Sequence, residues 1–250
     1  MPRAIISDVH ANFEALNAVL EDLRGQGIGE SEVYCLGDVI GYGASPRECM
    51  EACRGLALNL LGNHEEAVLF YPEDLSPTAR RAAEWTRHEL NSRRYPAERS
   101  EVLWDFLAGL EPSRREGDAL YVHASPRHET RDYVFPSDAA DAAKMQAIFS
   151  AIPRWGFHGH THVPGVLLEG GTYLRPDDVN GRFLLRKEKA FIDVGSVGQP
   201  RDADTRASYV TVDGPEVTFR RVTYDVEGAM GRIRASGLPG KLAERLMAGK

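Results

Sequence analysis

Short apolar runs followed by amphipathic stretches make up the first third of the chain. Ala4–Ser7 has the composition of a buried strand, and a helix is expected after it, with Phe13, Leu16, Leu20 and Leu23 on one face and Gly25 and Gly27 after its end. Val33–Leu36 and Leu56–Leu61 are predicted as further strands, with a helix between them from Pro46 to about Arg54. This strand–helix–strand alternation predicts an α/β sheet whose ligands gather at the strand ends.

The rest of the chain changes character twice. Residues 65–115 predict mainly helices with breaks near Pro72, Pro77 and Pro96, and residues 137–151 predict another helix. Strands are expected at 120–122, near 155–157 and at several places between 166 and 224, where 213–215 forms a hairpin turn. Residues 225–250 predict two short helices. No linker or repeat divides the chain, so we expect a single domain over residues 1–250.

Polar clusters follow the ends of these apolar strands. They are Asp8-Val9-His10, Gly37-Asp38, Gly62-Asn63-His64-Glu65, His123 and Gly159-His160-Thr161-His162. Each is weak alone, since a Gly-Asp pair is more often a turn and a lone histidine is usually structural. Together they place carboxylates, imidazoles and one amide at the same edge of one inferred sheet. That ligand set suits a pair of borderline metals such as manganese, iron, cobalt, nickel or zinc, with about four protein ligands each.

The ordered motifs resemble the calcineurin-like metallophosphoesterase superfamily, whose pattern is DxH, GDx, GNH[ED], a lone His and GHxH. Segments 37–43 and 194–201 further resemble a small bacterial phosphodiesterase branch, some of whose members hydrolyse dinucleoside polyphosphates. The resemblance implies a four-layer αββα sandwich, in which two mixed β-sheets are flanked by helices. One departure is Ala124, where the family usually has glycine, and we expect it to alter the pocket rim but not the ligand.

The resemblance also implies roles for individual residues. Two divalent or trivalent ions would be held by seven residues, with Asp38 bridging: Asp8, His10, Asp38 and His162 on one ion, and Asp38, Asn63, His123 and His160 on the other. Asp38 and His64 are the expected catalytic residues. His64 would serve the leaving group, either by donating a proton or by stabilising charge. Glu65 would orient His64 or be a solvated residue in the first turn of a helix.

A further group of residues is expected to contact the substrate, and Asn63 belongs both to this group and to the ligand set. Asn63, Tyr42, Arg127, His128 and Arg201 are the candidate substrate contacts, and ordinary packing or surface placement is the alternative for the last four. His158 is interpreted as a structural histidine rather than an eighth ligand, and His88 as part of a solvated helix face.

Charge and composition limit the classes of substrate and the cellular location that we expect. The formal net charge of −7 disfavours a protein that tracks polymeric nucleic acid, but a small phosphate ester, including a nucleotide, remains compatible because a metal centre supplies local positive charge. Three cysteines without a CxxC pair, and no apolar leader or membrane span, indicate a cytoplasmic protein. The oligomeric state stays open.

The favoured function is hydrolysis of small phosphodiesters or dinucleoside polyphosphates by a metal-activated water. A nuclease, or a phosphomonoesterase or protein phosphatase on the same site, is the alternative. A non-catalytic scaffold is disfavoured, because such proteins usually lose ligands and the seven positions are all present here.

Overall fold

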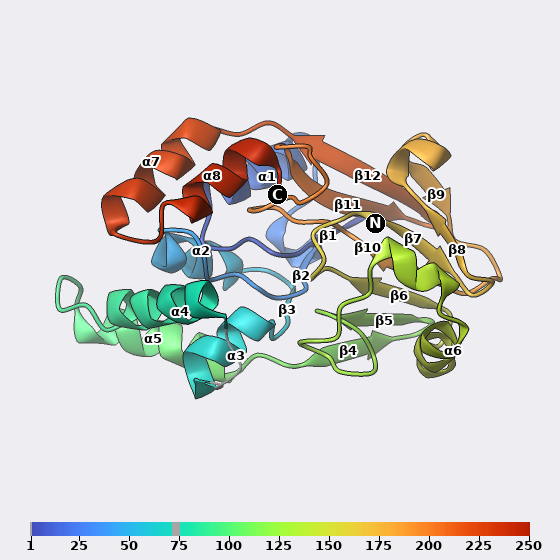
Figure 1. Cartoon of the computed structure of the whole chain (residues 1–250), viewed down its shortest axis with the longest axis horizontal. Coiled ribbons are helices and arrows are strands. Elements are labelled where there is room, and N and C mark those ends of the chain that lie inside the picture. The colour runs from blue at the N-terminus through green and yellow to red at the C-terminus, as the bar shows by residue number, and fades with distance from the viewer. Residues whose placement is uncertain (1, 72–75) are drawn as a thin grey trace.

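Two six-stranded sheets form the centre of the computed structural model, which describes residues 2–71 and 76–250 (Figure 1). In the first sheet the strand order is β3 (Leu58–Asn59), β2 (Val33–Cys35), β1 (Arg3–Ile6), β11 (Ala207–Asp213), β12 (Glu216–Val222) and β9 (Arg182–Leu184). In the second it is β4 (Ser113–Glu116), β5 (Ala119–Val122), β6 (Trp155–His158), β10 (Ala190–Asp193), β7 (Gly165–Leu168) and β8 (Thr172–Leu174). Both sheets are mixed: β1 pairs parallel to β2 and antiparallel to β11, and β10 pairs parallel to β6 and antiparallel to β7.

Helices flank the sheets and connect their strands. The α-helices are α1 (Phe13–Gly25), α2 (Pro46–Cys53), α3 (Asn63–Phe70), α4 (Pro77–Leu90), α5 (Ala97–Ala108), α6 (Ala142–Ala151), α7 (Val226–Ser236) and α8 (Lys241–Ala248). The described residues also contain the short 3₁₀ helices η1 (Glu30–Glu32), η2 (Pro136–Ala140) and η3 (Pro176–Val179). Within the described residues, no helix has both the length and the apolar character needed to cross a bilayer.

The apolar cores show the layer order directly. Alternate residues of β1 point to opposite faces of the first sheet, as the two-residue period of a strand requires: Ala4 and Ile6 pack with Leu16 of α1, whereas Ile5 packs with residues of the second sheet such as Ile192. A third core lies between the second sheet and α6. The result is a four-layer αββα sandwich, which confirms the fold implied by the motifs.

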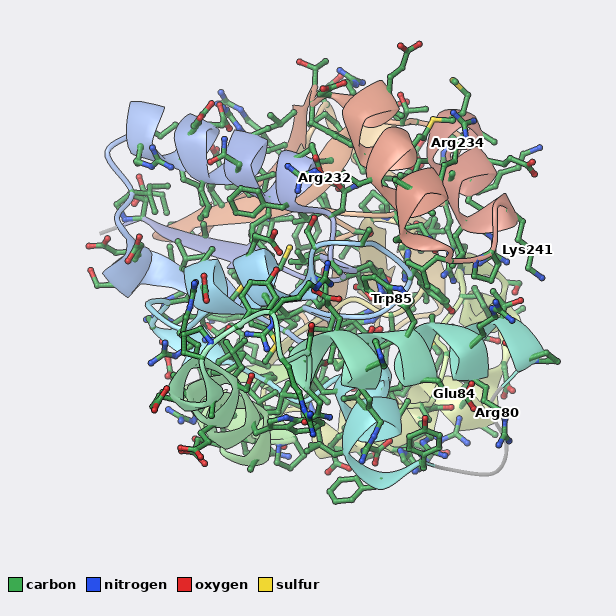
Figure 2. The ribbon with its side chains drawn as sticks, turned by 90° about the vertical axis from the view of Figure 1, so that its left-hand side faces the viewer. Arg80, Glu84, Trp85, Arg232, Arg234 and Lys241 are labelled. Atoms are coloured by element: carbon green, nitrogen blue, oxygen red, sulfur yellow. The ribbon has the colours of Figure 1, made fainter. Side chains whose placement is uncertain are left out.

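The two C-terminal helices, α7 and α8, form a further layer beside the sandwich (Figure 1). They pack on each other and enclose a core of their own, which Tyr42 and Trp85 also join. Figure 2 shows Trp85 between α4 and the α7–α8 pair, where its indole Nε1–H donates to the Ser236 carbonyl at 3.0 Å. We propose that these helices, the segment 65–115 and the sandwich form one domain.

The third predicted strand is shorter than expected. The sequence predicts one strand over Leu56–Leu61, but only Leu58 and Asn59 are paired with β2, because β2 ends at Cys35. The Leu60 backbone N–H still donates to the Cys35 carbonyl at 2.9 Å, and Leu60 forms an isolated bridge to Glu111.

The predicted helix over 137–151 is two elements. The Asp141 carboxylate accepts a hydrogen bond from the Lys144 backbone N–H at 2.9 Å and caps α6, so the preceding turn ends as the separate 3₁₀ helix η2. An N-cap inside an apolar-periodic stretch therefore divides it.

The segment 65–115 contains α3, α4 and α5, but its end departs from the predicted helical character. Residues 113–116 form β4, which pairs with β5 through a tight turn at Gly117. Pro77 is the first residue of α4 and Pro96 caps α5, as proline at helix starts allows. The break predicted near Pro72 lies outside the described residues.

Candidate metal centre

The loops that follow the parallel strands meet at one edge of the sandwich. Asp8 follows β1, Asp38 follows β2 and Asn63 begins α3 after β3, while His123 follows β5. His160 and His162 come after β6, which runs parallel to β5. Backbone hydrogen bonds join the first two loops, from Asp8 N–H to the Gly37 carbonyl at 3.0 Å and from His10 N–H to the Asp38 carbonyl at 2.9 Å. All seven side chains predicted as ligands are therefore brought together.

Several of these residues have a left-handed backbone. The φ angles are +56° at Asp8, +51° at His10, +52° at Asp38, +66° at His160 and +63° at His162. This region disfavours residues with a Cβ, at a cost of roughly 1–3 kcal/mol each, and it persists only where surrounding contacts impose it. Backbone strain concentrated on the candidate ligands indicates that the fold positions these side chains for function.

The first metal position is surrounded by Asp8, His10 and His162, with Asp38 at its border. His162 Nε2 lies 3.2 Å from both Asp8 Oδ1 and His10 Nε2. His10 Nε2 lies 3.6 Å from Asp8 Oδ1 and 3.7 Å from Asp38 Oδ2. Metal bonds of about 2.0–2.2 Å place neighbouring ligand atoms roughly 3–3.5 Å apart, so these spacings match one coordination shell.

The second metal position is surrounded by Asn63, His123, His160 and Asp38. His123 Nε2 lies 3.1 Å from Asn63 Oδ1, 3.1 Å from His160 Nδ1 and 3.4 Å from Asp38 Oδ2. The same oxygen, Asp38 Oδ2, borders the first position as well. Asp38 Oδ1 is held back by the His64 backbone N–H at 2.8 Å, which leaves Oδ2 free to face both positions.

Hydrogen bonds on the outer side of the rings fix which nitrogen faces inward. The Nδ1–H of His123 donates to the Leu36 carbonyl at 3.2 Å, and the Nδ1–H of His162 donates to the Gln199 carbonyl at 2.5 Å. Their Nε2 lone pairs therefore point at oxygen and nitrogen acceptors rather than at donors. Asp8 Oδ1 is buried without a hydrogen-bond donor from the described residues. Converging lone pairs of this kind need a cation between them, so the residues fit bound metal.

Burial sets the protonation of the imidazoles. Burial lowers the pKa of His10 to about 3, and the neighbouring charges of His162 and Arg201 lower it further. Burial also lowers the pKa of His64 well below its usual value, and the charges of His10 and Arg201 add to that shift. The pKa values of His123, His160 and His162 are lowered as well, mainly by burial. Neutral imidazole is the form that binds a metal ion.

The two carboxylates shift in opposite directions. Burial alone would raise the pKa of Asp8, but His162 and His10 take it well below its usual value. Burial raises the pKa of Asp38 well above its usual value, and the negative charges of Glu65 and Asp8 raise it further. A cation beside Asp38 Oδ2 would relieve this crowding of negative charge.

Glu65 lies in the first turn of α3, as one of the two expected alternatives has it, but it is buried rather than solvated. Its carboxylate is fully buried and accepts three backbone hydrogen bonds, from Asp38 N–H at 2.8 Å, Gly62 N–H at 2.9 Å and Ile40 N–H at 3.0 Å. Burial raises its pKa to about 7, and the three bonds oppose that rise. Glu65 is a clamp between the Asp38 loop and the start of α3, and it neither orients His64 nor faces solvent.

His64 and Tyr42 lie over the first metal position. His64 Nε2 is 4.0 Å from Asp38 Oδ2, farther than the ligand atoms are from one another. The Tyr42 ring lies 4.3 Å from the His64 ring and 4.9 Å from the His10 ring, between centroids. A side chain at Gly41 would collide with the His64 ring, because its Cβ would lie 2.2 Å from Nδ1. This glycine allows His64 to approach the site.

The other predicted substrate contacts divide in two. Arg201 is half-buried, its backbone N–H donates to the His162 carbonyl at 3.2 Å, and its charge acts on His10, His64 and Asp38. Arg127 instead pairs with Asp132 at 3.7 Å, and His128 is exposed. Among the contacts of the described residues, neither forms a hydrogen bond or ion pair with a candidate ligand.

His158, interpreted as a structural histidine, and His88, interpreted as part of a solvated helix face, both lie outside the ligand set. His158 stacks on Phe191 with ring centroids 4.0 Å apart, and its Nδ1 is 3.7 Å from Asp193. Asp193 accepts a hydrogen bond from the Thr161 hydroxyl at 2.5 Å and so braces the turn between the last two ligands. His88 is exposed on α4.

Sequence reasoning missed one side chain at the site. The Tyr133 ring stacks on the His160 ring at a centroid distance of 3.8 Å. Residues 124–135 carry no recognisable motif, and only the fold brings this loop to the second metal position.

Comparisons with known proteins agree with this geometry. The family model "Calcineurin-like phosphoesterase" matches residues 1–164. An uncharacterized protein of Methanocaldococcus jannaschii is 35% identical over 254 residues, covering 99% of this chain and 98% of the relative. The crystal structure of a metallophosphoesterase from Sphaerobacter thermophilus is similar with a TM-score of 0.82 and 37% identity over the full length of both chains. A hypothetical protein from Pyrococcus horikoshii OT3 shares the fold, with a TM-score of 0.76, 19% identity and coverage of 100% and 98%.

Proposed function

This chain belongs to the calcineurin-like phosphoesterase family and hydrolyses phosphate esters, and we propose that its substrates are small phosphodiesters, among them dinucleoside polyphosphates. The observation that supports a two-metal reaction most strongly is the position of Asp38 Oδ2. That oxygen is 3.7 Å from His10 Nε2 and 3.4 Å from His123 Nε2, between two separate groups of ligand atoms. One carboxylate shared in this way is typical of a dinuclear centre.

The proposed ions are two per chain, chosen from manganese, iron, nickel, cobalt and zinc because the ligands are imidazole, carboxylate and amide oxygen. Asp8, His10, Asp38 and His162 would hold one ion, and Asp38, Asn63, His123 and His160 the other. When bound, such ions supply an activated water and balance the charge that grows on the phosphoryl oxygens.

The side chains around the centre then have distinct tasks. The charged guanidinium of Arg201 would bind a phosphoryl oxygen, and Asn63 would orient the ester next to the second position. His64 is neutral in its buried position, so its ring N–H would stabilise the leaving oxygen by a hydrogen bond. Tyr42 covers His10 and His64 and would contact the organic group that leaves.

Charge favours a diester over a monoester. A monoester dianion gains most from several cationic side chains around its terminal oxygens, and the ligand motifs contain neither lysine nor arginine. A diester carries one negative charge, which the metal centre and Arg201 can balance, and its second organic group can be held by the aromatic rim. Exposed Arg127 and His128 are less suited to this rim than Tyr42 and Arg201.

The test compares substrates that share a leaving group. Manganese-reconstituted protein is assayed with p-nitrophenyl phosphate, methyl p-nitrophenyl phosphate and thymidine 5′-p-nitrophenyl phosphate, and then with dinucleoside polyphosphates against RNA. We expect higher kcat/KM for the two diesters and for the dinucleotides. A faster monoester would place the chain among phosphomonoesterases or protein phosphatases, and a preference for RNA would make it a nuclease.

Two further properties stay predictions. The three cysteines are free and buried, which agrees with the cytoplasmic location proposed from their spacing. A small phosphate ester, with no membrane or polymeric nucleic acid, is the proposed partner.

A further inference from the structure

An aromatic stack leads outward from the second metal position. The Tyr133 ring lies on the His160 ring at 3.8 Å with an interplanar angle of 23°, and the Phe135 ring lies parallel to Tyr133 at 5.2 Å and 5°. Tyr133 is 41% exposed and Phe135 is 43% exposed. Single exposed apolar residues are common, but here two stacked rings continue directly from a candidate ligand.

The loop that carries these rings is anchored at several points. The Thr130 hydroxyl and Arg131 Nε–H both donate to Glu66 Oε2 on α3, at 3.0 and 2.8 Å. Lys144 of α6 donates to the Tyr133 carbonyl at 2.5 Å. The Phe135 backbone N–H donates to Asp138 Oδ2 at 2.8 Å. These bonds fix the backbone on both sides of the rings, so the stack is formed before any ligand arrives.

Tyr133 also lies within the electric field of the metal centre. Burial raises the pKa of its hydroxyl, Arg201 opposes that rise, and Tyr42, Asp38 and Asp8 add to it. The contact that places Tyr133 at the site is the stacking of its ring on His160. Tyr42 covers the first metal position and Tyr133 the second, so each position has an aromatic ring beside it.

We propose that Tyr133 and Phe135 form a stacking platform for a planar organic group of nucleobase size, carried by the phosphodiester on the side of the second metal position. This inference rests on the proposed function and assigns the substrate class that the site prefers. Base stacking on aromatic side chains tolerates any base because every base offers a flat π face. The platform therefore selects for a nucleoside but not for one particular base.

A simpler role for Tyr133 is to brace the His160 ring. Phe135 separates the two roles, because its side chain stacks on Tyr133 rather than on a candidate ligand. The Phe135→Ala change removes platform surface and leaves the Tyr133–His160 contact in place. Tyr133→Phe keeps the ring and removes only the hydroxyl, whereas Tyr133→Leu removes the ring. Phe70→Ala is the matched control, since Phe70 is 71% exposed at the far end of α3.

The measured quantity is the ratio of kcat/KM for thymidine 5′-p-nitrophenyl phosphate to that for methyl p-nitrophenyl phosphate. The two diesters have the same leaving group and differ only in the retained group, so the ratio reports contacts to the nucleoside. We expect the ratio to fall about 10-fold in Phe135→Ala and in Tyr133→Leu, and to stay near the parent value in Tyr133→Phe and Phe70→Ala.

An unchanged ratio in both Phe135→Ala and Tyr133→Leu would overturn the platform and leave Tyr133 as a brace for His160. Failure of the proposed function gives a different result: the parent protein would hydrolyse p-nitrophenyl phosphate and neither diester. In that case calorimetry on the manganese-loaded protein decides the inference. Phe135→Ala should weaken binding of adenosine 5′-monophosphate about 10-fold relative to ribose 5-phosphate, and equal weakening of both would overturn it.

Discussion

His64 approaches the ligand atoms without joining them. Its Nε2 is 4.0 Å from Asp38 Oδ2, whereas ligand atoms within each metal position are 3.1–3.7 Å apart along the measured pairs. Its backbone N–H holds Asp38 Oδ1, and that contact does not depend on the side chain. The ring can therefore be removed while the metal ligands and their backbone support remain.

Removal of the His64 ring should lower the rate of hydrolysis without lowering the metal content. We expect His64→Ala to keep its metal content and to lose roughly 10²–10⁴-fold in kcat for an alkoxide leaving group. The loss should shrink for nitrophenol, which departs with little need for stabilisation. Steady-state rates across leaving groups of graded pKa, with elemental analysis, measure both effects. His88→Ala on exposed α4 is the control, and an equal loss across the series would contradict this role.

Gly159 allows the loop that carries His160 and His162 to pack closely against the Asp8 loop. A Cβ at this position would lie 2.3 Å from both Asp8 Oδ2 and Ser7 Oγ, so the Asp8 loop would have to move. We expect Gly159→Ala to weaken metal binding at the first position by at least 10-fold, as measured by manganese titration. Gly170→Ala, with no atom within 4 Å of its new Cβ, should bind like the parent protein. Parent-like affinity in Gly159→Ala would show that the two loops tolerate separation.

The sequence predicts which side chains meet at this centre, but it does not predict the backbone carbonyls and the aromatic ring that fix the orientation of the histidines. The ligand positions are recognisable because each follows an apolar run that ends in a polar motif. The Leu36 and Gln199 carbonyls that fix the histidine tautomers belong to the backbone, and a backbone acceptor leaves no signal in residue type. Tyr133 stacks on His160 across 27 positions of sequence, so only the tertiary fold defines their contact.

At the scale of elements, Glu65 connects the Asp38 loop to the start of α3. Three backbone N–H groups donate to its buried carboxylate, two from the loop after β2 and one from Gly62. The motif predicted an acidic residue in the first turn of a helix, which is correct. Its connection to another loop depends on how β2 and β3 sit side by side.

Glu65→Gln should loosen this connection. The amide keeps one acceptor oxygen, so at least one buried N–H loses its partner, and we expect a loss of about 1–3 kcal/mol in the free energy of unfolding. Urea unfolding of the metal-free chain measures it. Glu98→Gln is the matched control, because Glu98 is also acidic and in the first turn of a helix but is exposed. Equal losses of unfolding free energy in the two variants would show that Glu65 contributes only as a negative charge at a helix N-terminus.

Element boundaries were predicted well where apolar periodicity controls them and poorly where local caps or edges do. Helix α1 includes Gly25, which was expected just after the end of the helix, and the hairpin of β11 and β12 turns at 213–215 as predicted. The helix predicted over 137–151 is divided by the Asp141 cap, and β3 is short because β2, the strand that it pairs with, ends at Cys35. Side-chain capping and edge pairing compete with periodicity over distances of two or three residues.

At the scale of the molecule, the C-terminal helices pack against the Tyr42 side of the candidate metal centre. Tyr42 packs into the α7–α8 core, and the Ala203 backbone N–H, two residues after Arg201, donates to the Gly249 carbonyl at 3.0 Å. The family model ends at residue 164, before these helices begin. The ordered motifs thus predict the candidate metal ligands, whereas the helices that pack against Tyr42 lie outside the residues that the family model matches.

A cavity in the C-terminal core should therefore affect substrate binding at a distance. Leu242 is fully buried in that core, and Leu242→Ala should cost about 2–5 kcal/mol in stability and raise KM for a dinucleoside polyphosphate more than for methyl p-nitrophenyl phosphate. Thermal unfolding and steady-state kinetics measure the two effects. Met247→Ala on the same helix, with Met247 56% exposed, is the control. Equal KM changes for the two substrates would show that these helices do not affect the residues that contact the larger substrate.

Metal titration of the parent protein and of its Asp38→Asn and Asp8→Asn variants shows whether two ions share the Asp38 carboxylate. A dinuclear centre predicts two manganese ions per chain in the parent protein. It predicts weaker binding at both positions in Asp38→Asn, because Oδ2 borders both, and at one position in Asp8→Asn, because Asp8 Oδ1 borders only the first. A single ion per chain, with Asp38→Asn binding it as the parent protein does, would contradict a dinuclear centre.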